Sequence, residues 1–249
     1  MKYLITLICL AIATIGWGQD QDNFDKATTL YQKGDYTQAA AVYSSILKSG
    51  KESSALYYNL GNTYYKLNNV PESIYYYEKA LQLDPENADA KNNLIFANQM
   101  KVDAITPLPK TWVRQLSDGI VGLFSAHTWA VLSIIGVFAF VLSFLLYYFV
   151  ERTALKRTFF SLMLVFLFFA IGSYTLAHFC HKQVSQTQYA ILFDKTVRVF
   201  SDANAYSSEV MQLHEGTKVE IIEDAKDWVK IRLVNGKIGW TKVSSLRKL

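Results

Sequence analysis

Residues Ala55–Pro85, ALYYNLGNTYYKLNNVPESIYYYEKALQLDP, carry seven tyrosines and a ladder of leucines but no histidine and no cysteine. Three positions of the preceding segment recur in it at a constant spacing: Ala39, Tyr43 and Ile46 correspond to Ser73, Tyr77 and Ala80. A fixed period of about 34 residues indicates a helical repeat that stacks into a solenoid. The stretch therefore predicts a packed repeat whose tyrosines mostly fill the space between helices.

The second copy, residues 54–87, resembles the tetratricopeptide repeat. Its first helix carries Tyr57, Leu60 and Gly61, its second helix ends before Pro85, and NNVPE makes the turn between them. Gly61 is small where two helices are expected to cross closely. The first copy, residues 20–53, is degenerate at its start, and ADAKNNLIFANQM predicts a further helix that caps the stack. Residues 20–101 are thus predicted to be two repeats with a capping helix.

The register of that family, if it holds, places a set of polar and aromatic side chains on the concave face: Tyr58, Asn59, Asn62, Tyr65, Lys66 and Asn93. Asn59 and Asn93 are separated by one period of the repeat. An asparagine amide offers both a donor and an acceptor, so two equivalent asparagines can bind an extended peptide backbone. The alternative is that asparagine is simply common at this repeat position and that the tyrosines are packing residues.

The chain begins with MKYLITLICLAIATIGWGQD, in which one lysine precedes an uncharged apolar run. This layout is typical of a secretory signal peptide, which we expect to span residues 1–19. Cys9 lies inside the apolar run, so Cys180 is the one cysteine expected in the mature chain. A single cysteine cannot form an internal disulfide.

Two further apolar runs predict a membrane hairpin. Trp129–Phe149 is 21 residues without a charge and Thr158–Ala177 is 20, which is long enough in each case for a helix to cross a bilayer. We expect spans over residues 128–150 and 158–179, joined by the short loop 151–157. This loop has three basic residues and one acid, and such loops stay in the cytoplasm. With the signal peptide, this predicts an inner-membrane protein whose two soluble parts both face the periplasm.

Residues 102–127 are predicted to be a linker followed by an amphipathic helix, because apolar residues recur at helical spacing after Pro109. The helix either lies on the membrane surface or packs against the spans.

After the second span, His178, Cys180 and His181 lie close together in sequence. A helix would turn Cys180 away from the two histidines, and zinc normally needs more ligands than this. We predict no metal site and no cofactor.

Residues 188–249 change character again. Short runs rich in β-forming residues alternate with turns, and Asn235-Gly236 is a strong hairpin signal. The region resembles the bacterial SH3-like domain, a small all-β barrel. The candidate ligand contacts are its aromatic residues: Tyr206, Trp228 and Trp240. Thr196 stands where that family usually has an asparagine, and only Val197 and Arg198 match the usual turn, which weakens the prediction of its ligand-binding loop.

The predicted fold class is a multidomain membrane protein: an all-α tetratricopeptide solenoid, a two-helix transmembrane hairpin and a small all-β SH3-like barrel. No nucleophile elbow and no assignable carboxylate pair occurs in the sequence, so we do not expect an enzyme. The charge is mixed on both exterior parts, which argues against nucleic-acid binding.

This order of modules resembles the BatE-type proteins of the Bacteroidetes aerotolerance operon. The resemblance implies a non-enzymatic membrane component that works with envelope proteins carrying von Willebrand factor A domains, in envelope stress resistance. Two functions follow as alternatives. In one, the repeats hold a protein partner; in the other, the SH3-like domain binds peptidoglycan in the cell wall and the repeats are spacers.

Overall fold

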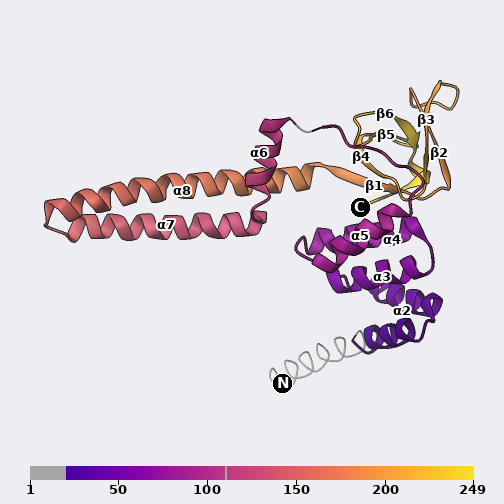
Figure 1. Cartoon of the computed structure of the whole chain (residues 1–249), viewed down its shortest axis with the longest axis horizontal. Coiled ribbons are helices and arrows are strands. Elements are labelled where there is room, and N and C mark those ends of the chain that lie inside the picture. Colours follow the sequence, from indigo (N-terminus) through magenta and orange to yellow (C-terminus); the bar gives the residue numbers. More distant parts are fainter. Residues whose placement is uncertain (1–20, 110) are drawn as a thin grey trace, which may run out of the picture. The chain divides into compact units, whose positions relative to one another are not determined.

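The structure is a computed structural model that describes residues 21–109 and 111–249, apart from the side chains of residues 113–114, 117–118 and 183–186. The predicted signal peptide, residues 1–19, lies outside the described residues. The chain forms two compact units: the residues up to Pro107 together with Gln188–Leu249, and Leu108–Thr187 (Figure 1).

The repeats consist of consecutive helices joined by short turns. They are a helix over residues 21–32, α2 (Tyr36–Lys48), α3 (Ser54–Lys66), α4 (Val70–Leu83) and α5 (Ala88–Gln99). The last three begin at side chains that accept a hydrogen bond from the first turn: Ser53, Asn69 and Asn87. The predicted turn between α3 and α4 is present, with Asn68 in the left-handed region at φ 56°. The predicted helical repeat region is confirmed.

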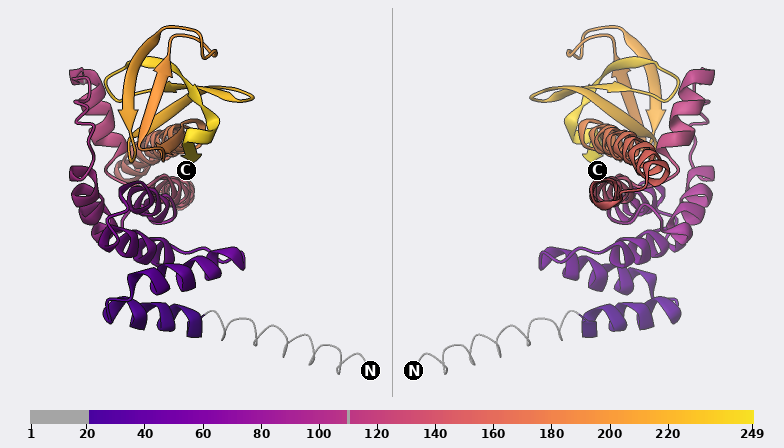
Figure 2. Two further views of the ribbon diagram at one scale, coloured as in Figure 1. Left: turned by 90° about the vertical axis from the view of Figure 1, so that its right-hand side faces the viewer. Right: turned by 90° about the vertical axis from the view of Figure 1, so that its left-hand side faces the viewer.

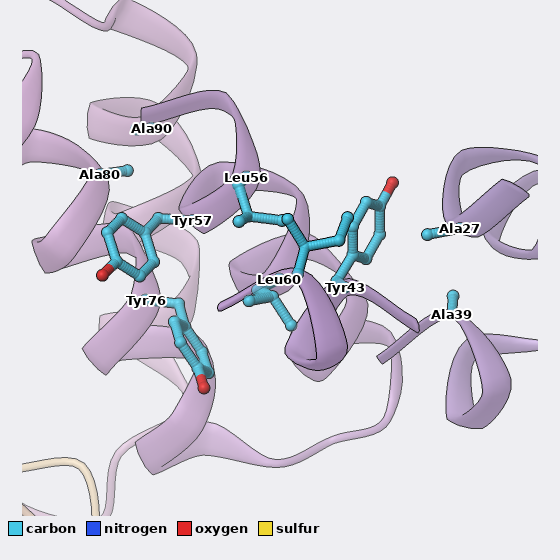
Figure 3. Packing of buried hydrophobic residues seen from close by; sticks show 10 residues of the cluster. Ala27, Ala39, Tyr43, Leu56, Tyr57, Leu60, Tyr76, Ala80 and Ala90 are labelled. Carbon is cyan, nitrogen blue, oxygen red and sulfur yellow. The ribbon is translucent and has the colours of Figure 1, made fainter. Parts of the chain in front are cut away.

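Close packing of α3 on α4 explains the small residue in the middle of α3. A Cβ atom at Gly61 would lie 2.5 Å from Cδ1 of Tyr77, so a larger residue would displace that ring. The Ser73 hydroxyl donates to the Gly61 carbonyl oxygen across the same contact, at 3.0 Å. Figure 3 shows Leu56 and Leu60 in the core of the repeats between tyrosine rings of neighbouring helices. The tyrosines of the repeat are therefore largely structural.

The C-terminal region is a seven-stranded antiparallel sheet in the order β3-β2-β6-β5-β4-β1-β7. Figure 2 shows these strands in orange and yellow. The strands are β1 (Gln188–Leu192), β2 (Thr196–Phe200), β3 (Glu209–His214), β4 (Lys218–Ala225), β5 (Trp228–Arg232), β6 (Ile238–Lys242) and β7 (Leu246–Lys248), with the 3₁₀ helix η1 (Val243–Ser245) before the last. Among these described strands, β3 and β7 stand at the two ends of the order.

The core of the sheet is apolar and its strands approach closely. Val199, Val219, Val229 and Ile231 are almost fully buried in one cluster. The predicted hairpin joins β5 to β6 at Asn235-Gly236, where Leu233 N–H donates to the Lys237 carbonyl at 2.9 Å. The predicted all-β region is thus present. Strand β2 begins at Thr196 and covers the start of the segment interpreted from the sequence as a family turn, whereas β3 begins later, at Glu209.

A carboxylate in the linker after α5 fastens the repeats to the sheet. Asp103 Oδ2 accepts hydrogen bonds from the His214 N–H at 2.6 Å and from the Thr217 hydroxyl at 2.7 Å. Asp103 Oδ1 lies 2.7 Å from Nδ1 of the His214 ring. We call these three residues the Asp103 clamp. Ile105, two residues further on, packs against the core of the sheet, so the linker is part of the folded unit.

A second contact joins α4 to the end of the chain. The Arg247 guanidinium lies 3.8 Å from the centroid of the Tyr75 ring and 4.2 Å from that of Phe193. It also donates to the Glu72 carboxylate. Cation–π contacts and a paired charge both favour this arrangement. The repeats and the sheet therefore share a continuous packed interface, which their separate sequence patterns did not predict.

The other unit is dominated by two long apolar helices, α7 (Ala126–Phe149) and α8 (Thr153–Gln186). Both are long and apolar enough to span a membrane. A Cβ at Gly136 would lie 3.1 Å from the Ala170 Cβ, and the Ser133 hydroxyl donates to the Ala170 carbonyl. Large side chains such as Phe138 remain exposed. Small residues thus line the contact between the helices, as is common in membrane hairpins.

The predicted amphipathic helix is present as α6 (Trp112–Val121). Its C-terminal end packs on the hairpin, where Val121 contacts the cluster of Trp129, Ala177 and Cys180. Trp112 and Leu116 stay exposed at 75% and 58%. One end of the helix therefore packs against the spans, while an apolar stripe remains uncovered within this unit.

Candidate functional site

A groove of about 280 Å³ opens on the repeats between the helix over residues 21–32, α3 and α5. Its wall consists of aromatic rings, two amides and one cation: Tyr31, Tyr58, Asn62, Tyr65, Lys66, Asn93 and Phe96. Five of the six contact residues predicted from the repeat register are among them. The sixth, Asn59, is half-buried on α3 and does not line the groove.

Two lining residues, Tyr31 and Phe96, were not predicted from the sequence. Tyr31 lies one period of the repeat before Tyr65, and Phe96 lies one period after Asn62. The same spacing that placed the central residues therefore also marks these two. In the sequence, this period was applied to Asn59 and Asn93 but not to Tyr65 and Asn62, whose equivalents are Tyr31 and Phe96.

A hydrogen-bond network holds the polar wall of the groove. The Tyr77 hydroxyl donates to Asn62 Oδ1 at 2.6 Å, and Asn93 Nδ2 donates to the same oxygen at 2.7 Å. Asn93 Nδ2 also lies 3.3 Å from the Tyr58 hydroxyl. The two asparagines come from α3 and α5, so the network fixes their amides relative to each other before any ligand arrives.

One donor and one acceptor remain available on this wall. Within the described part of the chain, Asn62 Nδ2 and Asn93 Oδ1 have no hydrogen-bond partner, and neither is among the buried unsatisfied atoms. Because both residues line the groove, these two atoms are the polar groups of the wall that a ligand could engage. A peptide group has one N–H and one C=O, which is the complement of this pair.

The groove contains one positive charge, and two phenols at its wall have a raised pKa. Lys66 is exposed and forms no ion pair with any residue in the described ranges. Burial raises the pKa of the Tyr77 phenol, and burial followed by repulsion from Tyr36 raises the pKa of Tyr31. The Tyr31 and Tyr77 phenols therefore stay neutral at physiological pH, and Lys66 gives the groove a preference for a negatively charged ligand.

A second hollow, of about 710 Å³, lies on the sheet beside Trp228. Its other lining residues come from the loop between β2 and β3, from the turn before β5 and from the end of β6 and the helix η1: Ala205, Lys226, Asp227, Lys242, Val243 and Ser244. Trp228 is half-buried and packs edge-on against Phe200, with ring centroids 5.6 Å apart. A hollow lined by an aromatic ring, two lysines and one aspartate can contact a ligand that has both apolar and charged groups.

The three aromatic residues predicted as SH3-like ligand contacts are not brought together. Trp228 lines the hollow, but Trp240 is only 9% exposed and lies under the Lys230 ammonium, 5.4 Å from its ring centroid. Tyr206 is fully exposed on the loop between β2 and β3 and does not line the hollow.

The histidines and the cysteine at the end of the second apolar helix lie in separate surroundings. The Cys180 thiol is buried against the Val121 carbonyl, whereas His178 stacks on the Tyr174 ring. Among the described residues, no group of three or more histidine, cysteine, aspartate or glutamate side chains is placed to hold a metal ion.

Comparison with known families agrees with this architecture. Residues 24–88 match the tetratricopeptide repeat, and residues 195–246 match the bacterial SH3 domain. No match was found among curated proteins. The tetratricopeptide repeat suggests binding to other proteins, and the bacterial SH3 domain suggests binding to the cell wall. The chain thus combines two kinds of non-catalytic interaction module with a hairpin that could span a membrane.

Proposed function

We propose that this protein is a membrane-anchored scaffold whose repeat groove binds an extended segment of a protein partner. The observation that carries the proposal is the free donor and acceptor pair of Asn62 and Asn93, held by hydrogen bonds beside the exposed Lys66. The pair matches one peptide group of the partner. The ammonium favours a partner segment with a carboxylate, either a side chain or a chain terminus.

The aromatic wall supports the same ligand class. Tyr58, Tyr65 and Phe96 line the groove with ring surface that can pack against side chains of a peptide. A volume of about 280 Å³ suits two or three residues and is small for a folded domain. We therefore expect the groove to bind a short segment of the partner with moderate affinity.

In this proposal the scaffold lies in the inner membrane, with the repeats and the sheet in the periplasm. The support comes from the signal-like start of the sequence, the two apolar helices and the basic turn between them. Two crossings return the chain to the side from which it started. The repeats and the sheet would then reach the same compartment, as their packed interface requires.

The partner class follows from the resemblance to BatE-type proteins of the aerotolerance operon. That resemblance implies an envelope complex with von Willebrand factor A proteins, active in envelope stress and not itself enzymatic. The groove supports a role in holding a partner. Among the described residues that line the groove and the hollow beside Trp228, no acid and base are paired in a way that would suggest catalysis.

Alanine variants of the groove test the proposal. Lys66→Ala and Asn93→Ala in the full-length chain should each lower the recovery of a cross-linked partner from native membranes by roughly tenfold, the order expected for losing a charged or paired polar contact. Asn59→Ala is the matched control, because Asn59 is on the same helix as Lys66 but outside the groove. Equal recovery from all three variants would contradict the proposal.

The second candidate is cell-wall binding by the sheet, supported by the hollow that Trp228, Lys226 and Lys242 line together. Peptidoglycan peptides carry carboxylates that these lysines could pair with. Trp228→Ala should then release the detergent-solubilised protein from isolated cell wall, whereas Tyr206→Ala, outside the hollow, should not. If Trp228→Ala leaves the protein bound to the cell wall and the groove variants release it, the result would favour the first candidate.

A further inference from the structure

The turn between the two apolar helices contains a hollow that neither the groove nor the sheet explains. Its volume is about 570 Å³, and it is lined by residues from the end of α7 and the first turns of α8: Tyr147, Thr153, Lys156, Arg157, Phe160 and Ser161. The lining combines two cations, three hydroxyl groups and two aromatic rings. This mixture is unlike a packed helix turn, in which apolar residues would fill the space.

The positive charge of the turn is not neutralised by the protein. In the part of the chain that the structure describes, neither Lys156 nor Arg157 forms an ion pair with a carboxylate. The Lys156 ammonium instead lies 5.4 Å from the centroid of the Tyr147 ring. Both cations lie near the N-terminus of α8, which begins at Thr153 and is the positive end of the helix dipole. No acid occurs in the first turn of this helix to offset their charge. An anion in the hollow would relieve this repulsion.

The position of the hollow identifies the source of the anion. It lies where the apolar parts of α7 and α8 end, and these helices leave large side chains such as Phe149 and Phe168 exposed at 74% and 70%. In a bilayer this level corresponds to the phospholipid headgroups. Phe160 and Tyr147 extend the hollow toward the apolar side, where the first carbons of an acyl chain would lie.

We propose that this hollow binds the phosphate of an anionic phospholipid, with Lys156 and Arg157 as the charged contacts and Thr153 as the hydroxyl donor, because the Ser161 hydroxyl already donates to the Arg157 carbonyl at 3.1 Å. Phosphate oxygens accept from ammonium, guanidinium and hydroxyl groups alike. Tyr147 and Phe160 contact the adjoining apolar part of the lipid. The proposal requires the hairpin to lie in a bilayer, but it does not depend on the groove or its partner.

Native mass spectrometry of the full-length protein tests this binding. The protein is released from micelles containing equal amounts of phosphatidylglycerol and phosphatidylcholine, and the ratio of the two bound lipids is measured. The wild type should retain phosphatidylglycerol preferentially. The double variant Lys156→Gln/Arg157→Gln should reduce this ratio roughly tenfold, the order expected for two basic contacts at a membrane surface.

Arg152→Gln is the matched control, because it removes one positive charge from the same turn but Arg152 does not line the hollow. It should change the ratio less than twofold, and Lys156→Arg, which keeps the charge, should retain the wild-type ratio. Far-UV circular dichroism confirms that each variant keeps its helices. A loss in Arg152→Gln as large as in the double variant would show diffuse attraction and overturn the site.

Inorganic phosphate separates a lipid from a soluble anion. A millimolar excess of phosphate added before release should leave the bound phosphatidylglycerol in place, because it cannot replace the contacts of Tyr147 and Phe160 with the apolar part of the lipid. Displacement of the lipid by free phosphate, or a wild type that retains both lipids equally, would overturn the proposal.

Discussion

Removing the carboxylate of the Asp103 clamp should loosen the sheet from the repeats without unfolding either. In Asp103→Ala, the His214 N–H and the Thr217 hydroxyl lose the acceptor that they share at 2.6 and 2.7 Å. The Asp103 side chain is only 11% exposed, so water replaces it poorly. Asp103→Asn keeps one oxygen acceptor but loses the charge, and should have an intermediate effect.

The magnitude follows from the type of hydrogen bond. A hydrogen bond to a charged group contributes about 1.5–3 kcal/mol net, and bonds that share one carboxylate are not additive, so Asp103→Ala should cost about 3 kcal/mol. A difference of this size corresponds to a factor of about 100 in a local opening equilibrium. The amide of His214 should therefore exchange its hydrogen about 100-fold faster in the variant.

Hydrogen exchange of the full-length protein in nanodiscs measures this effect residue by residue. The Val229 amide, in β5 at the centre of the sheet, is the internal reference and should change little. Equal acceleration at both positions would mean general destabilisation of the sheet, and no acceleration at His214 would mean that the clamp contributes nothing. Either result would refute the reasoning.

The remaining predictions concern acidity, packing and topology. Burial acts to raise the pKa of Asp103, but hydrogen bonds from His214 and Thr217 outweigh it and hold that pKa below its ordinary value of 3.8. The Asp103 clamp should therefore be fully formed above about pH 4 and be lost as the pH falls through the lower pKa of the folded state. Faster hydrogen exchange at the His214 amide would report this loss. Gly61→Ala should destabilise the repeats by about 1–3 kcal/mol in chemical denaturation, because its Cβ would lie 2.5 Å from the Tyr77 ring; an unchanged midpoint would count against this packing. With Cys180 replaced, cysteines at Ser53 and Ser207 should react with an impermeant thiol reagent once the outer membrane is permeabilised, and one at Thr153 should not; labelling at 153 alone would invert the topology.

The groove could be predicted from the sequence because a repeat fixes the positions of side chains. Once the period of the repeat is known, the family register places Tyr58, Asn62 and Asn93 on one face without further information. The sequence could not show which amide atoms of Asn62 and Asn93 lack a partner. This depends on Tyr77, a packing residue whose hydroxyl also donates to Asn62 Oδ1.

The contact between repeats and sheet could not be predicted, because it joins residues that share no periodic pattern. Asp103 and His214 are 111 residues apart and belong to different modules. The second apolar helix likewise extends beyond its expected apolar limits, from Thr153 to Gln186, because polar residues at both ends continue the helix. Hydropathy marks where a helix can cross a membrane and does not mark where the helix ends.

Photo-cross-linking from the groove tests the central claim most directly. In the full-length protein in native membranes, p-benzoylphenylalanine is placed at Phe96, which lines the groove, or at Ile95, which does not. The two positions are adjacent on α5 and similarly exposed, at 53% and 56%. The account predicts that position 96 forms an adduct with one envelope protein, that Lys66→Ala removes the adduct, and that position 95 forms none. Equal adducts from both positions, or an adduct at 96 that survives Lys66→Ala, would contradict the claim that the groove holds the partner.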